Sequence, residues 1–104
     1  MYIYNVTTNV TENTIEEWLN WTKETHIPAM IATGCFTGAK LTRVMVQEEM
    51  GGSTYSIQYS VKNKEIFKEY YLSHAANMNA NVEKKFSGNY VQFQTELEVL
   101  ADIY

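Results

Sequence analysis

Thr54-Tyr55-Ser56-Ile57-Gln58-Tyr59-Ser60-Val61 is the clearest structural signal in this chain of 104 residues. Apolar side chains alternate there with small or polar ones, and the apolar ones are β-branched or aromatic. A period of two predicts a β-strand that buries one face and leaves the other open. We therefore expect a sheet with one apolar and one polar face.

Two segments near the ends of the chain have the same character. Residues 2–10 alternate between two faces, with Tyr2 and Tyr4 on the apolar one. Residues 90–99 alternate as well, and we expect Val91 and the apolar residues at every second position after it to face the core. Both segments are predicted to be strands.

A fourth strand is predicted from residues 35–47, where the alternation is less regular. Gly38 and a shift in the apolar positions after it indicate a β-bulge. The two glycines that follow Glu48-Glu49-Met50 predict a hairpin turn into the strand quoted above.

Two helices are predicted between these strands. The first carries an apolar stripe at helical spacing over residues 15–26. Pro28 has no backbone N–H to donate, so this helix ends or restarts there. The second carries a stripe over residues 66–86 and is expected to break near Ser73-His74.

The order of these elements is β-α-β-β-α-β over a single domain, residues 1–104. Right-handed crossovers place both helices on one face of a four-stranded antiparallel sheet. The predicted fold class is therefore α+β and ferredoxin-like, with two broken helices on one face of the sheet.

The sheet face opposite the helices is predicted to be polar but almost uncharged. A face left in water usually carries Lys and Glu, whereas a face that a partner covers avoids charges that burial would leave unpaired. We expect a homodimer through this face; a merely polar, solvated face is the alternative. The predicted dimer face consists of Asn5, Thr7, Ser56, Gln58, Gln92 and Gln94.

The composition excludes some partners and favours others. The net charge is −4, the pI is about 5.1, and the lysines are scattered among glutamates, which argues against nucleic-acid binding. Charged residues make up 19%, below the usual share of about 25%, which favours a surface covered by a partner. No apolar run is long enough for a membrane helix and no signal peptide is visible, so we expect no membrane partner. A lone cysteine, Cys35, agrees with a reducing, cytoplasmic location.

Few residues are candidates for chemistry. The weak catalytic candidates are His26 in the first helix, and His74 with Tyr70 at the break of the second. Each histidine can equally cap a helix end and bond its last carbonyl groups. Two histidines without a carboxylate at matching spacing predict no metal site. Aromatic side chains between helices and sheet can line an apolar pocket. The candidate ligand-binding residues are Trp18, Trp21, His26, Tyr59 and Tyr71.

Several blocks of sequence together resemble a known family. They are Met1-Tyr2-Ile3-Tyr4-Asn5-Val6, Trp18 with His26-Ile27-Pro28, residues 32–41, residues 51–59, Tyr70-Tyr71 with His74-Ala75, and Phe93-Gln94-Thr95-Glu96-Leu97. Across essentially the whole chain they are similar to a family of short bacterial proteins described as domain of unknown function 4286. The resemblance implies a dimeric α/β-barrel and no particular activity.

More distantly, the layout is similar to the dimeric α/β-barrel superfamily, which includes antibiotic-biosynthesis monooxygenases and haem-degrading enzymes. The haem degraders of that group use a helix histidine as iron ligand, with an asparagine and a tryptophan nearby. Asn5 could take the place of the asparagine. Tyr70 and Tyr71 stand where a tryptophan would, and residues 75–86 contain no histidine. We therefore expect no haem and no other cofactor.

Two kinds of function stay open at this point, and the sequence does not decide whether the protein is an enzyme. The first is a dimeric protein that binds a small molecule or acts as a regulatory or interaction module. The alternative is a cofactor-free monooxygenase- or isomerase-like enzyme that uses His26 or His74 with a tyrosine. A pocket with an imidazole and open volume between helices and sheet favours the enzyme, whereas a filled core argues against it.

Overall fold

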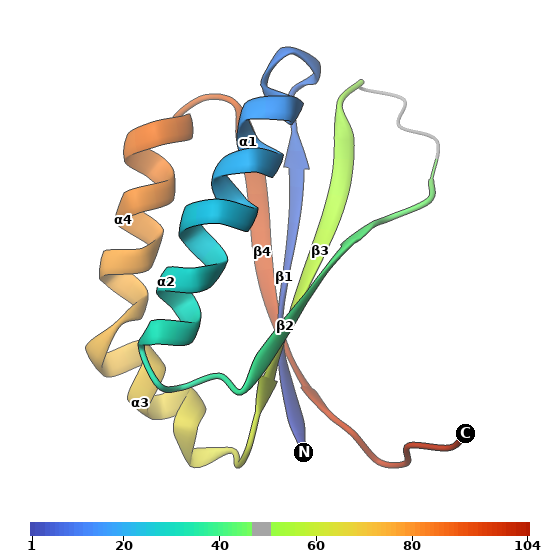
Figure 1. Ribbon diagram of the computed structural model, residues 1–104, viewed down its shortest axis with the longest axis vertical. Helices are drawn as coiled ribbons and strands as arrows, with labels where there is room; N and C mark the ends of the chain where they lie inside the picture. The colour runs from blue at the N-terminus through green and yellow to red at the C-terminus, as the bar shows by residue number, and fades with distance from the viewer. Residues whose placement is uncertain (47–50) are drawn as a thin grey trace.

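The computed structural model describes residues 1–46 and 51–104, and it has two layers, one of helices and one β-sheet (Figure 1). The elements in chain order are β1 (Tyr2–Val10), the 3-10 turn η1 (Glu12–Thr14), α1 (Ile15–Trp21), the π-helical segment η2 (Thr22–His26), α2 (Ile27–Ala32), β2 (Gly38–Arg43), β3 (Ser53–Val61), α3 (Glu65–Ser73), α4 (Ala75–Phe86) and β4 (Tyr90–Glu98).

The four strands form one antiparallel sheet in the order β2-β3-β1-β4. β1 lies between β3 and β4, so that Val6 is opposite Ile57 on one side and opposite Gln94 on the other. Figure 1 shows that both helical runs lie on the same side of the sheet. The predicted α+β, ferredoxin-like fold is confirmed.

The alternation of β3 shows correctly which side of the sheet is buried. Tyr55, Ile57, Tyr59 and Val61 are all buried beneath the helices. The helices contribute Trp18, Met30, Phe67, Tyr70, Val82 and Phe86 to the same core. The apolar stripe of each helical run therefore faces the sheet, as the helical spacing predicts.

The prediction for β4 has the two faces of the strand the wrong way round. Residues directly opposite each other in an antiparallel pair lie on the same face of the sheet. Gln94 is opposite Val6 and Gln92 is opposite Thr8, and the side chains of Val6 and Thr8 are buried beneath the helices. Gln92 and Gln94 therefore lie on the helix side, and their predicted place on the open face is wrong.

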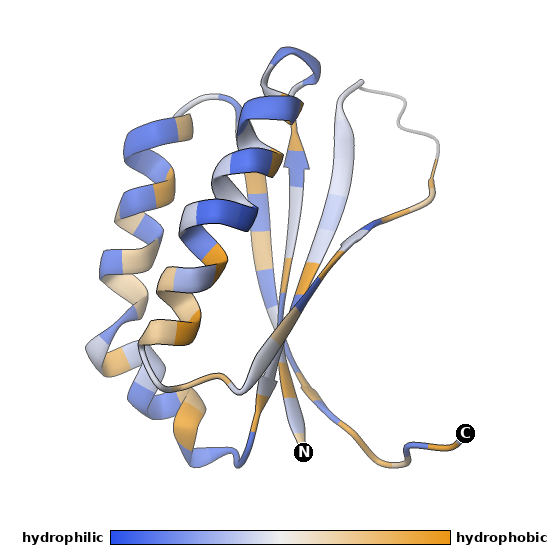
Figure 2. Ribbon diagram, viewed as in Figure 1, coloured by the Kyte–Doolittle hydropathy of each residue, from blue (hydrophilic) through white to orange (hydrophobic). Residues whose placement is uncertain are grey.

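Val91, Phe93 and Leu97 lie on the open face instead. Hydrophobic and hydrophilic residues do alternate along β4 (Figure 2), but the helices cover the inner side of this edge strand only in part. Gln94 and Glu96, for example, point to the helix side and are still exposed. Alternation shows that an edge strand has two different faces without showing which of them the core covers.

β2 is shorter than predicted and has no bulge. It covers Gly38–Arg43 rather than residues 35–47, and its pairing with β3 continues without an extra residue. Cys35 and Phe36 precede the strand and are buried in the core. The turn predicted at Glu48-Glu49-Met50 lies outside the described residues.

Both helical runs are interrupted near the predicted positions. A proline ring does not fit the regular α-helical hydrogen-bond ladder, and the wider turns of η2 come immediately before the restart at Ile27. Pro28 then lies in the first turn of α2, where its missing N–H leaves no gap in the ladder. The second run breaks at His74, whose φ of −133° separates α3 from α4.

Candidate functional site

The side of the sheet away from the helices is polar, with few charges. Alternate residues of all four strands form this surface, which we call the open face: Ile3, Asn5, Thr7 and Asn9 of β1, Gly38, Lys40 and Thr42 of β2, Thr54, Ser56, Gln58 and Ser60 of β3, and Val91, Phe93, Thr95 and Leu97 of β4. Lys40 is the one charged residue of this set. A sheet face in water usually carries several Lys and Glu residues.

The polar centre of the open face is ordered by hydrogen bonds between its own side chains. Ser56 donates to Oδ1 of Asn5 at 2.6 Å, and the Asn5 amide donates to Thr7 at 3.1 Å. Asn9 donates to Thr54 at 3.1 Å. Because these amides and hydroxyls already have partners, covering them costs less free energy than covering free polar groups.

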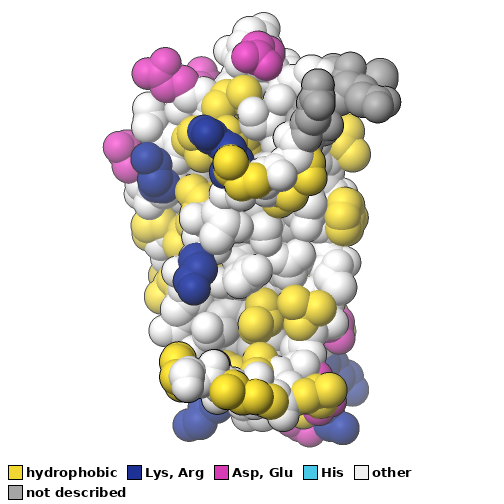
Figure 3. All heavy atoms as spheres, turned by 90° about the vertical axis from the view of Figure 1, so that its right-hand side faces the viewer, with side chains coloured by type: hydrophobic (Ala, Val, Ile, Leu, Met, Phe, Trp, Pro, Cys, Tyr) yellow, Lys and Arg dark blue, Asp and Glu magenta, His cyan; other side chains and the backbone are white. Residues whose placement is uncertain are grey.

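Hydrophobic side chains of β4 border this polar centre. The exposed fractions are 72% for Val91, 60% for Phe93 and 39% for Leu97. Figure 3 looks onto this side of the molecule: charged side chains are nearly absent from the middle, and hydrophobic ones gather toward the two ends. Neighbouring exposed apolar side chains on an uncharged face are typical of a surface that another molecule covers.

The segment after β4 extends the open face at one end. The backbone N–H of Val99 donates to the carbonyl oxygen of Met1 at 3.0 Å, which keeps the start of the segment beside β1. Residues 100–104 then run away from the sheet (Figure 1). A hollow of about 530 Å³ lies between the segment and the open face. Its lining includes Ile3, Lys40 and Gln58 of the sheet and Val99, Asp102 and Tyr104 of the segment.

The candidate pair at the break of the second helix is not arranged for proton transfer. The rings of Tyr70 and His74 lie 6.4 Å apart and nearly parallel. Tyr70 donates its hydroxyl hydrogen to Sδ of Met30 at 3.4 Å, and burial raises the pKa of Tyr70, with a further contribution from Tyr4. A buried phenol with a raised pKa is a poor acid. In the described part of the chain, no hydrogen bond joins either histidine side chain to a tyrosine.

His26 lies elsewhere, in a groove between the first helical run and α4. Its imidazole stacks on the indole of Trp21, with 4.9 Å between ring centroids and 17° between ring planes. Trp21 also contacts Phe86, at 5.2 Å between centroids. Lys84 and Lys85 line the α4 side of the groove. Burial lowers the pKa of His26 to about 4, so its imidazole is neutral at pH 7.

Acid is expected to destabilise the protein through His26. The pKa is about 4 in the folded chain against an ordinary value of 6.5, so the unfolded state binds the proton more tightly. This contribution to stability is complete above pH 6.5 and is lost as the pH falls to 4, by about 3 kcal/mol. Urea unfolding of the protein and of His26→Gln across this range measures the difference. An NMR titration that finds an imidazole pKa near 6.5 in the folded protein contradicts the prediction.

The predicted ligand-binding residues do not share one pocket. Trp18 and Tyr59 are buried in the packed core between helices and sheet. Tyr71 lies on α3, where its hydroxyl donates at 2.6 Å to a carboxylate of β4. With Trp21 and His26 in the groove between helices, the five residues occupy three separate places. Binding of a small molecule by this protein stays a prediction.

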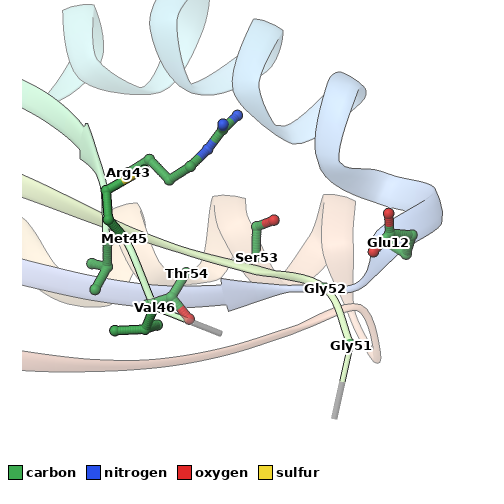
Figure 4. A pocket seen from close by; sticks show the side chains of 9 residues that line it. Glu12, Arg43, Met45, Val46, Gly51, Gly52, Ser53 and Thr54 are labelled. Carbon is green, nitrogen blue, oxygen red and sulfur yellow. The ribbon is translucent and has the colours of Figure 1, made fainter. Parts of the chain in front are cut away.

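Another pocket lies where β2 and the start of β3 approach η1 (Figure 4). Glu12 stands on one side of it, and the side chain of Arg43 points toward the helices. The guanidinium of Arg43 lies 5.8 Å from the centre of the Tyr55 ring, a cation–π contact that accounts for this orientation. The described residues of this pocket therefore include one acid and one base, without a histidine or cysteine beside them.

Residues 1–46 and 51–104 contain no group of three or more His, Cys, Asp or Glu side chains that could hold a metal ion. Within the same ranges, none of the helices combines the length and the apolar character needed to cross a lipid bilayer. Cys35 is a free, buried thiol.

Comparison with known proteins places this chain in a family and a fold. A family model described as Domain of unknown function (DUF4286) matches residues 1–100. A search of curated proteins gave no match.

Solved structures of distant proteins share the fold. A dimeric ferredoxin-like protein from an uncultured marine organism has a TM-score of 0.70 at 10% identity, covering 100% of this chain and 99% of that one. HapK from Hahella chejuensis has a TM-score of 0.70 at 10% identity, over 100% and 97% of the two chains. The heme degrader MhuD from Mycobacterium tuberculosis, solved with two hemes in its active site, has a TM-score of 0.69 at 14% identity, over 100% of both chains. At these identities the likeness shows the fold alone.

Proposed function

This chain belongs to the DUF4286 family, and from that premise we propose that it works as a homodimeric interaction module. Two copies pack through the open faces of their sheets and form an α/β-barrel with the helices outside. The composition of the open face carries the proposal. Lys40 is its one charge, and three apolar side chains of β4 are exposed on it.

The energetics of the open face favour a covered surface over a solvated one. Burying a Val, Leu or Phe side chain stabilises an assembly by about 1.5–3 kcal/mol. Thr, Ser and Gln are common on exposed strands, so the polar centre alone agrees with either state. Val91 and Phe93 agree only with the covered state. They lie next to the polar centre on the same face, and exposure of their apolar side chains to water stabilises nothing.

The similar structures support pairing. One of them is a dimeric ferredoxin-like protein whose fold matches this chain over its full length. A ferredoxin-like sheet with helices on one side has one face left for such pairing, and here that face is nearly uncharged.

The alternative of a cofactor-free enzyme has less support. His26 and His74 lie in different places, and neither has a hydrogen-bonded tyrosine among the described residues. The core between helices and sheet is filled with aromatic side chains, including Tyr4, Tyr59 and Tyr70. The MhuD structure contains heme, but residues 75–86 of this chain include no histidine that could bind heme iron.

Phe93→Glu tests the proposed dimer. The variant places a charge within the proposed interface, where burial would leave it unpaired, so we expect a monomer. The unaltered chain is expected at twice the 12.0 kDa of one copy when measured by light scattering at micromolar concentration.

Gln94→Glu is the matched control, because it adds the same charge one residue further along β4 on the helix side of the sheet. This variant is expected to stay dimeric. A monomeric unaltered chain, or equal effects of the two substitutions, overturns the proposal.

A further inference from the structure

We propose that residues 99–104 of each copy cross to the other copy and clamp the dimer, with Leu100, Ile103 and Tyr104 packed against the second chain. This inference rests on the sheet-face dimer proposed above. It assigns a role to a segment that lies outside the two-layer fold (Figures 1 and 2).

The segment has the composition of a buried strand, but its large apolar side chains are exposed. Leu100 and Ile103 are each 87% exposed, and Tyr104 is fully exposed. Asp102 is the one charged side chain of the segment. Large apolar side chains so close together in water mark a surface that a partner covers.

The position of the segment points to a second copy as that partner. The bond from Val99 to Met1 keeps its start beside the open face. The hollow between the segment and the sheet is lined by Ile3 and Gln58, which belong to the open face. The segment therefore stands on the open side of the sheet, and a second sheet packed on the open face must meet it.

Charge in the hollow agrees with this arrangement. Lys40 is the one charge on the open face, and Asp102 is the one charge on the segment; both line the same hollow. A lysine at the border of an interface needs a carboxylate to offset the loss of water. Asp102 supplies a carboxylate at this end of the open face.

The area of the open face indicates that the sheets need this additional contact. β1, β3 and β4 contain nine residues each. β2 adds six residues. At about 3.3 Å per residue and about 4.8 Å between strands, the face measures roughly 500 Å². A stable dimer buries about 800 Å² on each partner. In the proposed dimer, two crossing segments add to the buried area.

The test is the dimer dissociation constant of the double variant Leu100→Ser/Ile103→Ser, measured by analytical ultracentrifugation. We expect dimerisation to weaken by about tenfold or more, since each 1.4 kcal/mol of lost contact is a factor of ten. Leu72→Ser is the matched control, because Leu72 is 77% exposed on α3, in the helical layer. It is expected to leave the dissociation constant unchanged. A chain that ends at Val99 gives a second measure of the same contact.

The outcomes separate this inference from the proposed function. If the double variant and the shortened chain keep the original dissociation constant while Phe93→Glu is monomeric, the sheet dimer stands and the clamp is overturned. If Leu72→Ser weakens the dimer as much as the double variant, the clamp is overturned as well. If the unaltered chain is monomeric, the proposed function fails, and the clamp fails with it.

Discussion

Trp18→Ala is expected to lower the free energy of unfolding by about 3–5 kcal/mol, the usual cost of removing a buried aromatic side chain. Trp18 is 3% exposed, and its ring centroid lies 5.2 Å from that of Tyr55, so it joins α1 to β3. A domain of this size is stable by about 5–15 kcal/mol in total. The substitution therefore removes a large part of its stability, which urea unfolding at a fixed protein concentration measures.

Trp21→Ala is the control on the same helical run. Trp21 is half-buried against Phe86, so its removal leaves a smaller cavity and is expected to cost about half as much. Equal losses for the two tryptophans would mean that the core is not centred on the contact between α1 and β3.

Gly52→Ala is expected to destabilise the protein by about 3 kcal/mol or more. Gly52 has a φ of +75°, a conformation that costs other residues about 1–2 kcal/mol. A Cβ atom there would also overlap the carbonyl oxygen of Val10, which belongs to the backbone of β1 and cannot rotate away. The end of β1 or the start of β3 has to shift, and urea unfolding reports the cost.

Gly51→Ala separates the two causes. Gly51 has a similar φ of +80°, but a Cβ atom at this position meets no atom of the described residues within 4 Å. Its replacement is expected to cost only the backbone conformation, about 1–2 kcal/mol. If both variants lose the same stability, the overlap with Val10 is relieved without cost and the prediction for Gly52 is wrong.

The orientation of β3 could be predicted from the local sequence pattern, because a strand on each side fixes its place in the sheet. β3 lies between β2 and β1 beneath the helices, so its apolar residues have only one side on which to be buried. Tyr55, Ile57 and Tyr59 follow that rule without exception. The breaks of the helices near Pro28 and His74 could be read for a similar reason, since each depends on residues within one turn.

The candidate site could be read only in part. Asn5, Thr7, Ser56 and Gln58 belong to the open face as predicted, because their strands lie in the interior of the sheet. Phe93 and Val91 were missed, and Gln92 and Gln94 were misplaced, because β4 is an edge strand. Neither face of such a strand is certain to be covered, so its alternation alone does not indicate which side is buried. The exposed segment after β4 gave no periodic signal at all.

Local sequence determined the strands, the helices and their order in this protein, because alternation, helical spacing and proline geometry act over a few neighbouring residues. Only the tertiary structure decided the direction in which β4 faces, the separation of His26 from His74, and the position of residues 99–104 beside the open face. These depend on the register between strands that are far apart in the chain. Register is set by the packing of the whole sheet against the helices, which no single segment contains.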